Sequence, residues 1–201
     1  MKSALVRLFA VGALIGLGAC ASGTEPSAWK PEVPKFTCVA NSATMRLPEA
    51  FRANLPAFGD RGPQDEYVEI SQTVPGGFGG LFLHQGKLVL TFVDTATANA
   101  NRQQISAVFA GRGYNYASDV ATAEFRDARW TFAELDEWFR YIIPKLSVPG
   151  VSSMGIDERA NTINFGVIDE DARARLEGAL ASLGASCNLM TTVIEGYATP
   201  H

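Results

Sequence analysis

Two short strands, a helix and a third strand follow one another twice in this sequence, and this repeat constrains the fold more than any other feature. In the first copy, apolar residues alternate on either side of Gln85-Gly86, which predicts a β-hairpin with Gly86 at positive φ. Apolar residues recur at helical spacing over 95–110, and Gly111 suits the C-terminal cap of that helix. Residues 119–127 alternate again and predict a third strand.

The second copy repeats this order. Two alternating runs, 151–157 and 162–168, flank a short polar turn and predict a second hairpin. Asp169 caps the helix that follows, and residues 188–195 predict a last strand. Asp94 holds the same position in the first copy, 75 residues earlier. Self-similarity at a fixed spacing indicates a duplicated module.

A single helix over 132–143 joins the two copies. Thr131 and Glu134 form a capping box at its start, and the apolar residues behind them share one face. Two strands connected through a helix suit a sheet with helices packed on one face. We therefore expect an α+β fold built from two ββαβ modules, over about 79–127 and 151–195.

Two shorter segments precede the modules. Pro48 near the start and Pro56 at the end delimit a short helix from Leu47 to about Leu55. The pattern over 64–74 is compatible both with a helix and with a strand.

The first twenty residues predict export from the cytoplasm. Lys2 and Arg7 precede an uncharged apolar run, and this order is typical of a secretory signal. The run has 12 residues, too few to span roughly 30 Å of hydrocarbon. Its ending, Leu17 to Cys20, resembles the bacterial lipobox, which implies cleavage before Cys20 and lipid attachment to its sulfur. An ordinary signal peptide cut nearby is the alternative.

The residues after Cys20 predict where the anchored protein lies. Ala21, rather than Asp, resembles the outer-membrane sorting pattern of Gram-negative lipoproteins, so we expect an outer-membrane anchor facing the periplasm. The proline-rich stretch over 20–35 predicts a semi-extended tether. Removing residues 1–19 takes the formal net charge from −4 to −6. This mildly acidic balance, with no basic tract, argues against nucleic acid as a partner.

Three cysteines remain after such a cleavage. If Cys20 carries lipid, Cys38 and Cys187 are left as a pair in an oxidising compartment. A disulfide between them would close nearly the whole domain, with a stabilisation on the order of 5 kcal/mol in the chain-entropy model. Two buried free thiols are the alternative. The sequence has two histidines and no Cys-x-x-Cys, so we expect no metal site and no cofactor.

Four short motifs follow one another in an order known from one protein family. They are Phe78 to Phe82, the hairpin into Leu88 to Val93, the capped helix start Thr131 to Leu135, and Val151 to Asp157. This series resembles the pro-regions that precede bacterial chymotrypsin-like serine proteases of the α-lytic and streptogrisin kind. The resemblance covers roughly residues 64–196.

The resemblance implies a binding role. In that family the pro-region folds its protease and then inhibits it, and it carries no catalytic residues. It lays strands against the enzyme and places its C-terminal tail in the active site. For this chain, that implies binding roles for the edge strand near 188–195 and for the tail from Tyr197 to His201, which includes Pro200. No protease domain follows in this sequence, and the Pro-His ending is not an obvious fit to a pocket for small apolar side chains.

Residue types that often carry catalysis have simpler explanations here. Ser152 and Ser153 lie between glycines, but the Gly-x-Ser-x-Gly elbow is absent, and His84 and His201 are expected to be solvated. Grouped carboxylates fall in the first turns of helices, where capping and the helix dipole favour negative charge. The glycine run over 75–80 precedes a strand and lacks the Gly-Lys-Ser/Thr ending of a phosphate loop.

Tyr114 and Tyr116 lie in a loop and are the better candidates for a binding surface. We therefore expect a non-enzymatic, membrane-anchored periplasmic lipoprotein that binds another protein, as a protease inhibitor or a folding helper. A structural lipoprotein of the envelope and a small-ligand binder with a pocket between the modules are the alternatives. An open edge strand favours the first hypothesis, and a deep apolar pocket with convergent polar groups favours the last.

Overall fold

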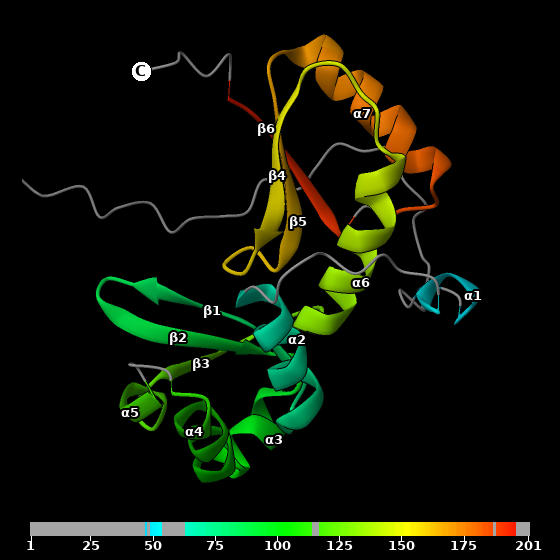
Figure 1. Cartoon of the computed structure of the whole chain (residues 1–201). Coiled ribbons are helices and arrows are strands. Elements are labelled where there is room, and N and C mark those ends of the chain that lie inside the picture. Colours follow the sequence, from blue (N-terminus) through cyan, green and yellow to red (C-terminus); the bar gives the residue numbers. More distant parts are fainter. Residues whose placement is uncertain (1–46, 48, 54–62, 114–116, 187, 196–201) are drawn as a thin grey trace, which may run out of the picture. The chain divides into compact units, whose positions relative to one another are not determined.

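The computed structural model describes residues 47, 49–53, 63–113, 117–186 and 188–195 (Figure 1). This part of the chain contains two three-stranded sheets, with strand orders β1-β2-β3 and β4-β5-β6. Helices pack against both sheets. The α+β fold with two similar modules, expected from the repeat, is confirmed.

The first module is built around a hairpin and a parallel third strand. β1 runs antiparallel to β2, and β2 runs parallel to β3. Gln85 and Gly86 have φ values of 50° and 76°, as a tight two-residue hairpin turn needs. The elements are β1 (Phe78–His84), β2 (Lys87–Phe92), α3 (Thr95–Ala100), α4 (Arg102–Gly111), α5 (Ala117–Val120) and β3 (Glu124–Asp127).

The second module has the same strand directions. β4 and β5 are antiparallel, and β5 and β6 are parallel. The predicted caps are confirmed in both modules, because Asp94 accepts the N–H of Thr97 and Asp169 accepts that of Ala172. The elements are β4 (Val151–Asp157), β5 (Thr162–Val167), α7 (Glu170–Ser182) and β6 (Met190–Ile194).

The two sheets agree in detail as well as in outline. Register shifts occur between Phe78 and Gly80 in the first hairpin and between Val151 and Ser153 in the second, at the same step of each strand. Just after the third strand, the N–H of Ala128 donates to the Phe92 carbonyl at 2.8 Å. In the second module, the N–H of Glu195 donates to the Val167 carbonyl at 2.9 Å. Residues of one sheet therefore have assignable equivalents in the other.

The helical segment of the first module differs from the prediction. The single helix expected over 95–110 is two helices that meet at Asn101. The second of them includes Gly111, and Gly113, with φ of 74°, supplies the positive φ beyond its end. The predicted C-cap at Gly111 is therefore wrong by two residues.

The third strand of the first module is shorter than predicted. It begins at Glu124, because residues 117–120 form α5 and bury Val120 in the core. The Arg102 guanidinium donates to the carbonyls of Val120 and Ala123, at 3.2 and 2.7 Å. These bonds satisfy backbone groups that a strand would have paired.

The two segments before the modules are helical. Pro63–Thr73 forms α2, which settles the ambiguity over 64–74, and its Ile70 is buried in the core of the first module. Proline at the first helical position fits, because that N–H has no intrahelical partner. Glu49–Arg52 forms α1, shorter than the predicted helix, whose last two residues lie outside the described part.

Helix α6 (Phe132–Ile142) contributes to the cores of both modules. Its capping box is confirmed, and a 3₁₀ turn over Ile143–Lys145 follows at the proline. Phe132 is buried in the first core, where its ring meets that of Tyr67 edge to face at 5.2 Å. The other buried apolar residues of α6 belong to the second core: Leu135, Trp138, Phe139 and Ile142.

Asn161, in the turn between β4 and β5, bonds the second module to the first. It is 7% exposed and has φ of 53°. Its Oδ1 accepts the N–H groups of Arg129 and Trp130 at 2.8 and 2.7 Å. Its Nδ2 donates to the carbonyls of Trp130 and Gly79 at 2.9 and 3.2 Å. One side chain thus holds the second hairpin against β1 and against the segment that leads into α6.

A partly buried charge cluster joins α2 to α6. The Arg140 guanidinium contacts the carboxylates of Asp136 and Asp65, each at 2.6 Å. Asp136 is buried, and its Oδ1 has no hydrogen-bond partner among the described residues. Burial raises the pKa of Asp136 above its usual value, and the Arg140 interactions only partly oppose this.

The raised pKa of Asp136 predicts how stability changes with pH. The folded state binds a proton at Asp136 more readily than the unfolded state, so this residue's contribution to stability is lost as pH rises through the folded pKa. We expect wild type to gain stability relative to Asp136→Asn as pH falls from 7 toward 4. Urea unfolding of both proteins at several pH values measures this difference. A difference that shrinks on acidification would contradict the assignment.

Candidate functional site

The site residues named from the sequence lie outside the described residues: Cys20, Cys38, Tyr114, Tyr116, Cys187, Tyr197, Pro200 and His201. Of the residues weighed for catalysis, His84 ends β1, whereas Ser152 and Ser153 lie at the start of β4 in the other sheet. The strand predicted over 188–195 is present as β6, and it is an edge strand.

One side of β6 pairs with β5 and the other side is open. The N–H of Ile163 donates to the Leu189 carbonyl, and the N–H of Glu195 donates to the Val167 carbonyl. Because backbone groups alternate in direction along a strand, Met190, Thr192 and Ile194 direct their N–H and C=O groups away from β5. No strand of the described part pairs with this edge.

The end of β6 is also apolar and exposed. Val193 and Ile194 are 47% and 40% exposed, on opposite faces of the strand. Ile194 pairs with Val167, which pairs with Val151 of β4, so an apolar row crosses the sheet. An open strand edge with apolar side chains is a ready template for pairing with another chain.

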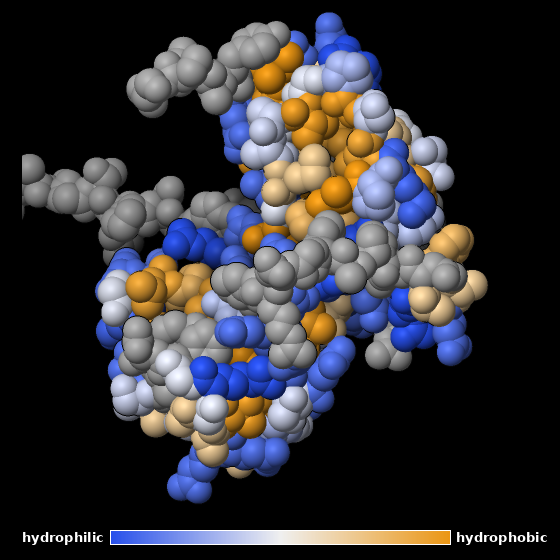
Figure 2. All heavy atoms as spheres, in the orientation of Figure 1, coloured by the Kyte–Doolittle hydropathy of each residue, from blue (hydrophilic) through white to orange (hydrophobic). Residues whose placement is uncertain are grey.

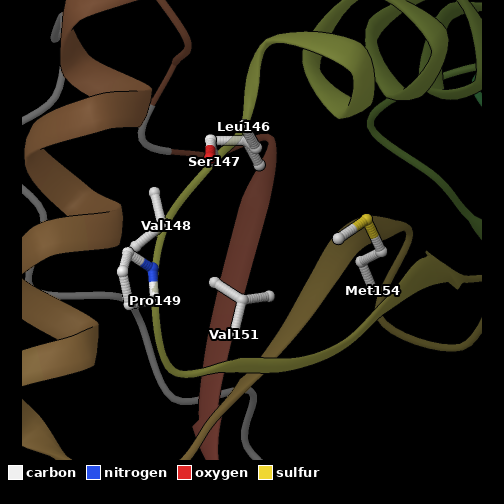
Figure 3. Close-up of a pocket in the computed structure, with 6 residues that line it drawn as sticks. All are labelled: Leu146, Ser147, Val148, Pro149, Val151 and Met154. Carbon is white, nitrogen blue, oxygen red and sulfur yellow. The ribbon is translucent and has the colours of Figure 1, made fainter.

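A shallow groove lies at the other end of this row. It has a volume of about 340 Å³, and its lining joins the loop before β4 to β4 itself (Figure 3). In Figure 2, apolar side chains gather over the second module between β4 and the helices α6 and α7. The groove is lined by Leu146, Ser147, Val148, Pro149, Val151 and Met154. Ser147 supplies the only hydroxyl of this lining, and none of the six side chains is titratable. The groove belongs to the second module alone.

The carboxylate of Glu195, the residue after β6, is held in place by two hydrogen bonds. Glu195 Oε2 accepts hydrogen bonds from the hydroxyls of Ser152 and Ser153, at 3.1 and 2.9 Å. The carboxylate reaches across β5 at Gly166, where a Cβ would collide with Glu195 and with the Ser153 hydroxyl. We call these three residues the Glu195 clasp. Within the described part of the chain, no arginine, lysine or histidine forms an ion pair with Glu195.

Sequence reasoning weighed the two serines only as nucleophiles and missed the clasp. A signal for it exists in the repeat, because Ser152 and Ser153 occupy the positions that Gly79 and Gly80 hold in the first module. Glu195 likewise stands where the first module has Ala128. Such polar replacements in one copy of a duplicated unit indicate a local function or contact that the other copy lacks.

Other kinds of site receive no support from the described residues. No group of three His, Cys, Asp or Glu side chains there lies close enough to hold a metal ion. No helix of that part is long and apolar enough to cross a membrane. The chain matches no protein family model and no curated protein.

Proposed function

We propose that this chain is a protein-binding module that adds an extended segment of its partner to the open edge of β6. The observation that carries the proposal is the row of outward backbone groups at Met190, Thr192 and Ile194, next to exposed Val193. Strand addition is a general recognition mode in which main-chain hydrogen bonds supply affinity and alternate side chains supply specificity.

Binding is strongest for a partner that supplies both backbone hydrogen bonds and apolar side chains. Each intermolecular backbone hydrogen bond contributes about 0.5–1.5 kcal/mol net. Covering Val193 and Ile194 adds roughly 25 cal/mol for each Å² of apolar surface removed from water. A strand laid along this edge would bury both side chains, one on each face.

The cellular location and the class of partner are inferred from the sequence. The lipobox-like ending at Cys20 supports a lipid anchor in the outer membrane facing the periplasm. The series of motifs supports a partner among chymotrypsin-like bacterial proteases, with the chain acting as inhibitor or folding helper and performing no catalysis itself. A structural role in the envelope without such a partner is the alternative.

Two substitutions at Ile194 test strand addition. Ile194→Pro removes an outward N–H, whereas Ile194→Ala removes most of the side chain and keeps that N–H. We expect the proline variant to bind about tenfold more weakly than the alanine variant, because a partner carbonyl is left without a donor. Proline is tolerated on edge strands, so both variants should fold.

The assay uses the chain purified in mild detergent and a panel of bacterial chymotrypsin-like proteases. Residual protease activity is followed against the molar ratio of chain to enzyme. Stoichiometric inhibition that is retained in the alanine variant and about tenfold weaker in the proline variant supports the proposal. Equal inhibition by both variants would show that β6 is not the contact. Undiminished activity across the panel would favour the structural alternative.

A further inference from the structure

In the first sheet, the turn between β4 and β5 packs against Gly79 and Gly80 of β1. Asn161 donates to the Gly79 carbonyl, and a Cβ on Gly80 would meet the side chain of Glu158 at 2.7 Å. A Cβ on Gly79 would meet Ala128 at 2.7 Å. The small residues of this spot therefore make room for the turn of another hairpin.

The equivalent spot on the second sheet is the Glu195 clasp, and it is exposed. Ser152 and Ser153 replace the two glycines, and Glu195 replaces Ala128. All three side chains face solvent. The position that receives a turn in one module therefore presents a charged, hydrogen-bonded group in the other.

The chemistry of the clasp selects its ligand. Two hydroxyls bind one carboxylate oxygen, and the absence of a Cβ at Gly166 lets the carboxylate lie close to β5. A carboxylate fixed in this way loses little freedom when it binds a cation. Because the two hydroxyls occupy the lone pairs of Oε2, a cation would bind through the other oxygen, and a guanidinium suits this role because it keeps its charge and forms strong charge-assisted N–H···O bonds.

We propose that the Glu195 clasp is a docking site for an arginine on a turn of the partner protein. This inference deepens the proposed function, since it names one contact on the surface that includes the end of β6. The clasp binds the partner's turn at the position where Gly79, Gly80 and Ala128 of the first module bind the turn between β4 and β5. Charge pairing takes the place of the close backbone packing found there.

Cyclised β-hairpin peptides with a four-residue turn are the probe. Three peptides carry Arg, Gln or Glu at one turn position and are otherwise identical. Fluorescence anisotropy measures their binding to the chain in mild detergent at low salt. We expect the Arg peptide to bind about fivefold more tightly than the Glu peptide, with the ratio falling toward one at high salt.

Variants of the clasp separate charge from position. Glu195→Gln should abolish the preference for Arg, and Glu195→Lys should reverse it. Gly166→Ala keeps the charge but displaces the carboxylate, so it should weaken the preference. Asp171→Asn is the control, because it removes one negative charge from the exposed first turn of α7 in the same module and leaves the clasp intact. Circular dichroism checks that each variant is folded.

Equal affinities for the Arg and Glu peptides would overturn the proposal, as would an undiminished preference in Glu195→Gln. Absence of binding by all three peptides would overturn it too. None of these outcomes bears on strand addition, which the two Ile194 variants test separately.

Discussion

Replacing Asn161 by alanine is expected to lower the free energy of unfolding by about 4 kcal/mol. The substitution leaves two N–H groups and two carbonyls, on Gly79, Arg129 and Trp130, without their partner. Each buried polar group left unpaired costs about 1–3 kcal/mol. Alanine also tolerates φ of 53° less well than asparagine does. Urea unfolding followed by tryptophan fluorescence measures the loss.

Gln85→Ala is the matched control for this prediction. Gln85 also has positive φ, 50°, but it lies exposed in the turn between β1 and β2. Its substitution should change the free energy of unfolding by less than about 0.5 kcal/mol. Similar losses in the two variants would mean that backbone conformation matters at Asn161, rather than its hydrogen bonds.

Loss of the predicted disulfide should have an effect of similar size or larger. Cys38 and Cys187 lie outside the described residues, but Ser186 and Leu189 are buried, so the chain on either side of Cys187 is fixed in the domain. We expect the oxidised chain to be more stable than a Cys38→Ser, Cys187→Ser double variant by about 5 kcal/mol.

Two measurements check the disulfide. In the first, the chain is treated with an alkylating agent without reductant, and its intact mass shows whether the two thiols have reacted. In the second, urea unfolding with and without reductant gives the change in the free energy of unfolding. Reductant should destabilise wild type and leave the double variant unaffected. Alkylation of both thiols without reductant would rule the disulfide out.

Local signals explain why so much of the fold could be predicted. The caps at Asp94, Thr131 and Asp169 depend on bonds that reach three residues along the chain. The turn at Gly86 is equally local. The predicted start of the third strand at 119 was wrong because the nine residues 119–127 also fit the end of a short helix followed by a strand, and burial of Val120 in the core favours the helix.

The candidate site was harder to predict because its contacts are distant in sequence. The Asn161 amide bonds a carbonyl 82 residues away, and the Ser152 hydroxyl bonds a carboxylate 43 residues away. No local pattern around Asn161, Ser152 or Glu195 indicates such pairing. The edge position of β6 also depends on strand order, which alternation along one strand does not give.

The most direct test of the account is amide hydrogen exchange along β6, measured by NMR on the free chain and on its complex with an inhibited protease. In the free chain, the outward amides of Met190, Thr192 and Ile194 should exchange much faster than those of Thr191 and Val193, which bond β5. Partner binding should then slow the outward amides specifically. Outward amides that are already protected in the free chain, or that a bound partner leaves unchanged, would contradict strand addition at this edge.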